Sequence, residues 1–191
     1  MNQLVLIKNV KKRYIKNKVY NLEINKGDFI LLTGENGAGK STLIKLILRF
    51  IHPDGGQIKV KNKLKITFLS ERINLPVLVN TLDYIKMYYD CNNEYIDYNF
   101  LNSLDIPLNR VINKLSKGNK QKLALFITLL NNRDLIILDE PLNGLDTNSI
   151  KKIKAKITEL HNKGTSFLIS THLKSTFKSL FNKEYQLWLD I

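Results

Sequence analysis

The sequence predicts an α/β fold, in which helices cover both faces of a mainly parallel sheet. Three apolar segments, residues 29–33, 135–138 and 166–169, have the length and composition of strands that are buried on both faces. Segments with helical spacing alternate with these strands along the chain, which is typical of strand–helix–strand units. Such units place successive strands parallel to one another in a single sheet.

The first part of the chain has the pattern of antiparallel strands. Apolar runs at residues 4–7 and 19–24 flank a lysine-rich stretch and predict two strands of a hairpin or meander. Residues 58–66 alternate apolar residues with lysine around an Asn-Lys turn, which predicts an edge hairpin whose lysines oppose edge-to-edge association. A phosphate-binding patch is the alternative interpretation of these lysines. Residues 66–70 form a further candidate strand.

A helical subdomain is predicted between about residues 78 and 114, where the chain is rich in aromatic residues and asparagine with helical spacing. We expect it to be inserted into a core formed by about residues 1–77 and 115–191, so that residues 1–191 make a single domain. The pattern after the insertion predicts further elements: helices at 119–130, 147–161 and 173–181, and a strand at 185–189.

The charge of the chain is unusual, with 30 lysine and arginine residues against 17 aspartate and glutamate residues, a net charge of +13. Such a balance suits nucleic acid, an anionic membrane surface or a polyanionic ligand. The basic residues are scattered, so the charge alone identifies no partner. The longest central apolar run, residues 123–130, is far shorter than the ~18 residues needed to cross a bilayer. We therefore expect a soluble protein, whose single cysteine excludes an intramolecular disulfide.

Residues 34–41 (GENGAGKS) match the phosphate-binding pattern G-x-x-x-x-G-K-[ST] in full, between a buried strand and a helix. Glycines let backbone N–H groups surround a phosphate, and the following helix presents its positive end to it. We expect Lys40 to reach the β- and γ-phosphates and the Ser41 hydroxyl to ligate Mg²⁺. The motif in this context predicts a nucleoside triphosphatase.

An acidic pair, Asp139 and Glu140, follows the buried strand at residues 135–138. The strand carries Asp139 to the carboxyl edge of the sheet, where it can hold Mg²⁺ directly or through water. Glu140 can accept a proton from the water that attacks the γ-phosphate. An acidic pair after a strand is by itself a common solvated loop, but beside a complete phosphate loop we interpret it as catalytic.

Three later segments resemble motifs of the ATP-binding cassette (ABC) family. Residues 115–119 (LSKGN) resemble its LSGGQ signature, residues 143–146 (NGLD) resemble its D-loop, and residues 170–172 (STH) resemble its switch histidine at the end of a strand. Tyr14 matches the aromatic residue that stacks on adenine, and Glu71 falls in the position of the Q-loop. The motifs follow in the family's order over essentially the whole chain, which is identified as a member of this family.

The resemblance implies a P-loop NTPase core of ABC type, with an N-terminal antiparallel β-subdomain and an inserted α-helical subdomain, and it implies ATP and Mg²⁺ as ligands. The implied catalytic residues are Glu140, His172 and Lys40, and the implied metal-binding residues are Ser41, Asp139 and Glu71. The implied ATP-binding residues are Tyr14, Gly34, Asn36, Gly37, Ala38, Gly39, Lys40, Ser41, Thr42, Glu71, Ser116, Gly118 and Asp146. Plainer roles stay open: a strand aromatic at Tyr14, a packed histidine at 172 and an ordinary helix cap at Ser116.

The sequence departs from the family pattern at a few positions. Glu71 stands where most members have Gln, so an acceptor is kept, an amide donor is lost and a charge is added. Lys117 and Asn119 replace the second Gly and the Gln of the signature, and Asn143 replaces the D-loop Ser. If position 117 required a left-handed backbone, Lys would cost ~1 kcal/mol there. Since the phosphate loop and the acidic pair are intact, we expect hydrolysis to survive.

In the family, each ATP lies between the phosphate loop of one cassette and the signature of another, so this chain is expected to pair with itself or with a second cassette. The resemblance implies the ATP-hydrolysing subunit of an ABC transporter, cytoplasmic and bound to the inner face of the cell membrane. Separate transmembrane permease subunits would dock beside Glu71 and the helical insertion. Glu71 and the LSKG form of the signature favour export of a peptide, drug or antibiotic over import.

Two other classes stay open. The net charge of +13 favours a soluble ABC ATPase that acts on nucleic acid or ribosomes. Such proteins usually carry two cassettes in one chain or a long coiled coil, and neither is seen here, so no nucleic-acid partner is expected. A non-hydrolysing adaptor would have lost Glu140 and His172. The transported substrate is not encoded in any recognisable motif.

Overall fold

The structure is a computed structural model that describes residues 2–13 and 15–188. Its parallel sheet has the strand order β5 (Ile66–Leu69), β6 (Leu135–Asp139), β7 (Ser166–Ser170), β3 (Phe29–Gly34) and β8 (Lys183–Leu187). Every neighbouring pair in this sheet is parallel, which confirms the predicted α/β architecture. Because parallel strands end at the same edge, the ends of β3, β6 and β7 lie together.

An antiparallel sheet forms the outer layer, with the order β2 (Ile15–Asn25), β1 (Gln3–Lys12) and β4 (Gly55–Val60). The predicted pairing of the first two strands is confirmed. The edge hairpin predicted for residues 58–66 is wrong, because β4 pairs with β1 whereas β5 pairs with β6 in the other sheet. Leu69 and Phe68 join hydrophobic clusters on opposite faces, so β5 needs cover on both faces, which a central parallel sheet provides.

Two hydrophobic cores lie on opposite faces of the parallel sheet. Alternate residues of β3 serve each: Ile30 and Leu32 join the core under α1 (Lys40–Ile47) and the antiparallel sheet. Phe29 and Leu31 join the core under the remaining helices. These helices are α2 (Thr81–Cys91), α3 (Tyr98–Ser103), α4 (Lys117–Thr128) and α5 (Thr147–Asn162). A strand buried on both faces must be apolar throughout, which explains the uninterrupted run FILL.

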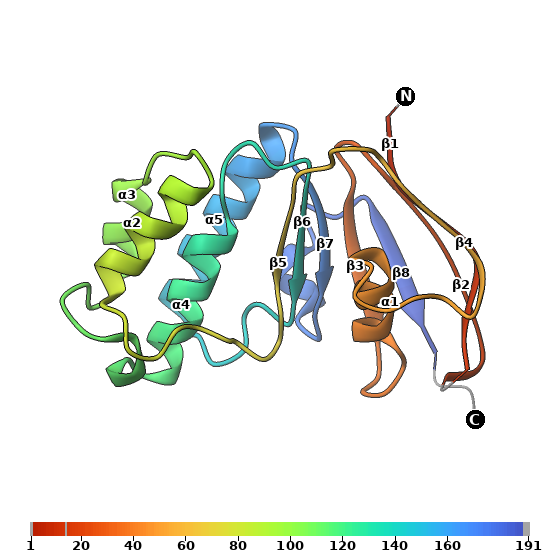
Figure 1. Cartoon of the computed structure of the whole chain (residues 1–191), viewed down its shortest axis with the longest axis horizontal. Coiled ribbons are helices and arrows are strands. Elements are labelled where there is room, and N and C mark those ends of the chain that lie inside the picture. The colour runs from red at the N-terminus through yellow and green to blue at the C-terminus, as the bar shows by residue number, and fades with distance from the viewer. Residues whose placement is uncertain (1, 14, 189–191) are drawn as a thin grey trace.

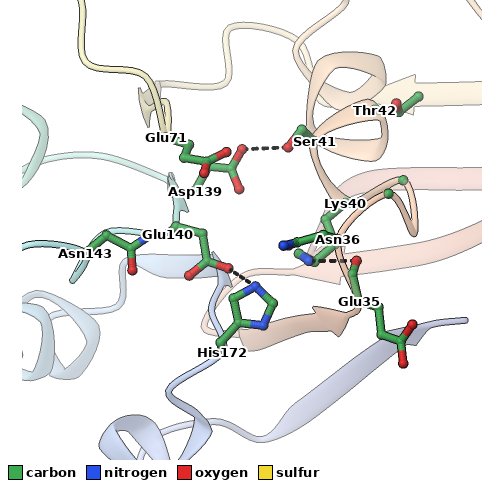
Figure 2. Close-up of a pocket in the computed structure, with 12 residues that line it drawn as sticks. Glu35, Asn36, Lys40, Ser41, Thr42, Glu71, Asp139, Glu140, Asn143 and His172 are labelled. Carbon is green, nitrogen blue, oxygen red and sulfur yellow. Dashed lines mark hydrogen bonds and ion pairs between the residues drawn. The ribbon is translucent and has the colours of Figure 1, made fainter. Parts of the chain in front are cut away.

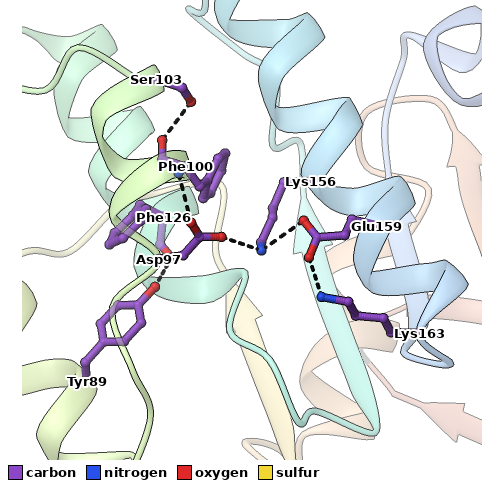
Figure 3. A network of polar contacts seen from close by, with 8 residues as sticks. All are labelled: Tyr89, Asp97, Phe100, Ser103, Phe126, Lys156, Glu159 and Lys163. Atoms are coloured by element: carbon purple, nitrogen blue, oxygen red, sulfur yellow. Dashed lines mark hydrogen bonds and ion pairs between the residues drawn. The ribbon is translucent and has the colours of Figure 1, made fainter.

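The helical insertion, with α2 and α3, lies outside α4 and α5 (Figure 1). Figure 3 shows how it is joined to α5: Lys156 Nζ lies 2.8 Å from Asp97 Oδ2 and 3.1 Å from Glu159 Oε2. The Lys156 side chain is only 4% exposed, and its Nζ lies 5.7 Å from the centre of the Phe100 ring. The insertion is therefore attached to the core by an ion pair whose lysine is buried and whose carboxylate is partly exposed.

The last predicted helix, at residues 173–181, is wrong. The structure has only a 3₁₀ turn, η2 (Lys174–Phe177), before β8 begins. Phe177 is the one residue of this turn that is buried, and Leu180 and Phe181 beyond it are only partly buried against the core. So short a segment does not offset the cost of nucleating an α-helix. Another 3₁₀ turn, η1 (Ile112–Lys114), precedes α4. None of the helices in the described part of the chain combines the length and the apolar composition that a membrane span requires.

Candidate functional site

The ends of β3, β6 and β7 surround a cavity of about 570 Å³ (Figure 2). Residues of the phosphate loop and the first turn of α1 form one side of it, and the residues that follow β6 and β7 form the other. The lining residues are Glu35, Asn36, Gly37, Gly39, Lys40, Ser41, Thr42, Glu71, Asp139, Glu140, Asn143 and His172. The structure thus brings together most of the site residues that the sequence predicts.

The phosphate loop joins β3 to α1 through a backbone that only glycine adopts easily. Gly39 has a φ of 93° and occupies the N-cap position of α1. A Cβ atom at Gly34 would lie 2.3 Å from the Leu187 carbonyl oxygen, so β8 can end beside the loop only because this residue is glycine. The first turn of α1 has no acidic residue, which leaves the positive end of the helix free to bind an anion.

Lys40 is 8% exposed and donates hydrogen bonds to two carbonyl oxygens of its own loop, those of Gly34 at 2.7 Å and Glu35 at 3.1 Å. Among the residues that the structure describes, no carboxylate forms an ion pair with Lys40. A buried cation without a counter-ion is costly. An anion in the adjoining cavity would remove that cost.

Asp139 is 4% exposed and accepts two hydroxyl hydrogen bonds. Ser41 Oγ donates to Asp139 Oδ2 at 3.0 Å, and Ser170 Oγ donates to Oδ1. Glu71 lines the same cavity (Figure 2). A hydroxyl and two carboxylates are hard oxygen donors of the kind that Mg²⁺ prefers, so the residues present fit this ion.

Glu140 follows β6 with a left-handed backbone, φ 48°, and is 7% exposed. Its Oε1 lies 3.2 Å from His172 Nε2, but the two are not aligned as a hydrogen bond, and Oε1 has no hydrogen-bond partner among the described residues. Burial raises the pKa of the Glu140 carboxyl, although the charges of His172 and Lys40 oppose the shift. A buried carboxylate with a free oxygen at a cavity wall is suited to accept a proton.

Ser116 and Gly118 of the signature and Asp146 of the D-loop do not line this cavity, whereas Asn143 of the D-loop does. Ser116 is exposed and caps α4, since its Oγ accepts a hydrogen bond from Asn119 N at 3.2 Å. Asp146 caps α5, and hydrogen bonds from the Ser149 hydroxyl and backbone N–H lower its pKa to about 2. Gly118 approaches the D-loop, because a Cβ atom there would lie 3.4 Å from the Gly144 carbonyl oxygen. These segments form one surface beside the cavity.

Some predicted residues have other positions. Gly34 and Ala38 do not line the cavity, and Ala38 is completely buried. Lys117 is the first residue of α4 and is absent from the residues with positive φ, so the backbone penalty considered for it does not arise. Tyr14 lies outside the described residues.

A few residues at or near the site were not predicted as site residues from the sequence. Glu35 and Asn143 line the cavity. A signal for Asn143 existed, because it lies three residues after Glu140 in the same loop. Lys18 donates a hydrogen bond to the Ala38 carbonyl oxygen at 2.6 Å, and no motif marks this lysine in the sequence. Gln121 joins α4 to the loop after Glu140 through a 2.7 Å hydrogen bond to Pro141 O.

Comparison with known proteins gives consistent matches. Residues 17–143 match the family described as ABC transporter. A zinc import ATP-binding protein of Wigglesworthia glossinidia brevipalpis is 34% identical over 168 residues, 84% of this chain and 72% of that protein. An ergothioneine transport ATP-binding protein of Helicobacter pylori is 30% identical and covers 98% of both chains.

Solved structures have the same fold. An ABC transporter ATP-binding protein from Pyrococcus furiosus superposes with a TM-score of 0.76 at 27% identity, over 96% of both chains. A dimeric ATP-binding cassette with bound ADP and phosphate superposes with a TM-score of 0.79 at 22% identity, over 98% of this chain and 97% of that one.

Proposed function

The chain belongs to the ABC transporter family as an ATP-binding cassette, and on this basis we propose which residues bind and hydrolyse ATP and where the cassette works. One observation supports the site assignment above the others. The buried Lys40, whose hydrogen-bond acceptors among the described residues are both carbonyls, faces the same cavity as the acidic residues Asp139 and Glu140. A positive loop opposite an acidic pair suits a triphosphate with its metal ion and an attacking water.

The phosphate loop binds the substrate in this proposal. Lys40 exchanges its two carbonyl acceptors for phosphate oxygens, and the N-terminus of α1 adds its positive end. Ser41, Asp139 and Glu71 would hold Mg²⁺, which supplies positive charge to the phosphates when bound. The hydrogen bond between Ser41 and Asp139 already holds two of these oxygens together.

Glu140 acts as the general base. It takes a proton from the water that attacks the γ-phosphorus, the bond to the β-phosphate oxygen breaks, and ADP and phosphate leave. His172 lies 3.2 Å from Glu140 and lines the cavity, so we assign it to orienting Glu140 and the reacting phosphate. The raised pKa of Glu140 makes its carboxylate a stronger proton acceptor.

One copy of the chain holds half of a complete site. The signature residues Ser116 and Gly118 lie outside the cavity of their own chain, at the exposed start of α4. We propose that a second cassette, the same chain or another, presents its signature to this cavity when ATP is bound. Permease subunits in the membrane then receive the resulting movement, which places the cassette at the inner face of the membrane.

The direction of transport is a separate part of the proposal. The prediction of export rests on Glu71 and the LSKG segment, and it gains no support from the relatives. One relative is named for zinc import and another for ergothioneine transport, and these names favour uptake of a small substrate. Transport of a radiolabelled substrate, measured in cells with and without the chain, decides between the two directions. Cells without the chain are expected to lose efflux of the substrate if the direction is export.

The substitution Glu140→Gln tests the catalytic assignment. We expect ATP binding to be kept and steady-state hydrolysis to fall by roughly 10²–10⁴-fold, the usual contribution of a positioned base. The control is Glu159→Gln on α5, which lies outside the cavity and should leave turnover unchanged. Wild-type turnover in Glu140→Gln would show that another group is the base.

The pairing of cassettes is tested in the same background. Glu140→Gln is expected to be monomeric with ADP and dimeric with ATP and Mg²⁺, as measured by size-exclusion chromatography with light scattering. Adding Ser116→Arg should abolish the dimer without weakening ATP binding to the monomer, because Ser116 does not line its own chain's cavity. A dimer that survives Ser116→Arg would contradict a signature-to-loop arrangement. An ATP-loaded Glu140→Gln protein that stays monomeric would indicate a different second cassette.

A further inference from the structure

Lys18, on β2, is a buried cation beneath the phosphate loop. It is 9% exposed, and its Nζ donates hydrogen bonds to Ala38 O at 2.6 Å and Trp188 O at 2.5 Å. Both acceptors are neutral carbonyl oxygens. Within the described part of the chain, no carboxylate forms an ion pair with Lys18. Among the described residues, its positive charge therefore has no opposite charge paired with it, beside a loop that we assign to a polyanion.

These contacts bring three distant segments together. Ala38 belongs to the phosphate loop, and Trp188 follows β8, whose Leu187 pairs with Gly34 at the start of that loop. Lys18 comes from the antiparallel sheet and reaches the loop and the end of β8 at once. Tyr20, two residues further along β2 and fully buried, donates from its Oη to Gly39 O at 3.4 Å. The strand thus contacts two successive carbonyls of the loop.

The direction of these carbonyls has a consequence for the loop's donors. In a planar trans peptide, the C=O and the N–H of the next residue point in opposite directions. A hydrogen bond that holds Ala38 O toward Lys18 therefore turns the Gly39 N–H away from β2. The contact of Tyr20 with Gly39 O does the same for the Lys40 N–H. Gly39 and Lys40 both line the cavity.

We propose that Lys18 is a positioning residue for the phosphate loop, which aims the Gly39 N–H at the nucleotide phosphates and adds a second buried positive charge behind Lys40. This inference rests on the proposed ATP-binding function. It predicts a dependence that a purely structural lysine does not have: the effect of removing Lys18 should grow with the negative charge of the bound nucleotide. If only packing were lost, the binding of ATP, ADP and AMP would be weakened equally.

The test measures dissociation constants for ATP, ADP and AMP by isothermal titration calorimetry, together with the melting temperature of the nucleotide-free protein. For Lys18→Met we expect the affinity for ATP to fall about tenfold, the size of effect expected when one charge acts through the protein interior. The affinity for ADP should fall less, and the affinity for AMP should fall least. Lys18→Arg, which keeps the charge and a donor, should recover most of the affinity for ATP. The matched control is Lys156→Met, which removes another buried lysine far from the loop and should change none of the three constants.

Wild-type affinity for ATP in Lys18→Met, or an equal loss for all three nucleotides, overturns the proposal. If Lys18→Met does not fold, Lys18→Gln is measured in its place, with the same graded loss expected and the same two results against it. Failure of the proposed function would give a different result, since the wild-type protein itself would then bind no ATP. Lys40→Met serves as the reference, because it shows how much nucleotide affinity is lost when a lysine assigned to contact the phosphates directly is removed.

Discussion

Two buried lysines in this molecule have nearly the same exposure and opposite surroundings. Lys40 is 8% exposed in the phosphate loop, and Lys156 is 5% exposed on α5. Lys156 contacts the carboxylates of Asp97 and Glu159 and lies near the Phe100 ring (Figure 3). Lys40 contacts two carbonyl oxygens and opens onto a cavity (Figure 2). The partners, and not the burial, distinguish a lysine that holds the fold together from one that is prepared for a ligand.

The difference follows from the cost of removing a charge from water. A buried ammonium ion loses several kcal/mol of hydration unless opposite charges or hydrogen bonds replace it. Two carboxylates neutralise Lys156, so its attachment of α3 to α5 is complete without a ligand. The carbonyl dipoles around Lys40 replace only part of its hydration, and the remainder is available to favour binding of an anion.

The largest expected effect is on nucleotide binding by Lys40→Met. We expect ATP affinity to fall by about 100-fold, because charge-assisted contacts to the phosphates are lost. The free energy of unfolding without nucleotide should not fall, since a buried and unneutralised charge is removed. Calorimetric titration and urea unfolding measure the two quantities. A marked loss of stability with unchanged ATP affinity would make Lys40 a structural residue like Lys156.

Lys156→Met should show the opposite pattern. We expect the free energy of unfolding to fall by about 2 kcal/mol, less than for a fully buried pair, because Asp97 and Glu159 are partly exposed. ATP affinity of the folded protein should be unchanged. Urea unfolding followed by circular dichroism gives the first quantity, and titration of the folded protein gives the second. Weakened ATP binding would mean that the helical insertion and the site are coupled through this ion pair.

The smallest effect is on acid stability. Burial raises the pKa of Asp97, but the hydrogen bonds from Lys156 and the Phe100 N–H outweigh it and leave the pKa below its usual value. A carboxyl with a lowered pKa in the folded state stabilises the fold above its unfolded pKa of ~3.9, and this contribution is lost as the pH falls further. Between about pH 5 and pH 3, the wild type should therefore lose more stability than Lys156→Met, by less than about 1 kcal/mol. An equal pH dependence of the free energy of unfolding in the two proteins would show that the ion pair between Lys156 and Asp97 does not contribute to stability.

Much of the site could be predicted because its residues are adjacent in sequence to the strands that position them. Ser41 follows β3 by a short loop, Asp139 ends β6 and His172 follows β7, so a motif and a strand together locate each side chain. The edge hairpin at residues 58–66 was predicted wrongly because local alternation does not reveal which sheet a strand joins. Choice of sheet depends on burial of both faces of β5, which is a tertiary property.

Lys18 could not be predicted for a related reason. In the sequence it is one of many lysines, and its two acceptors, Ala38 and Trp188, lie 20 and 170 residues away. The same holds for Lys156, whose partner Asp97 is 59 residues distant. Periodicity predicts that position 156 lies on a helix, but not that a carboxylate from the insertion meets it there.

The strand order of the parallel sheet also has a consequence for the synthesis of the chain. The phosphate loop follows β3, yet β3 lies between β7 and β8, which are far downstream in the sequence. Phe29 pairs with Phe167, and Gly34 pairs with Leu187. A ribosome releases the N-terminal segments first, and pairing across such separations waits for the distant partner. The nascent chain therefore carries an unpaired β3 and an unsupported phosphate loop until β7 and β8 have emerged, and ATP can assist folding only after that point.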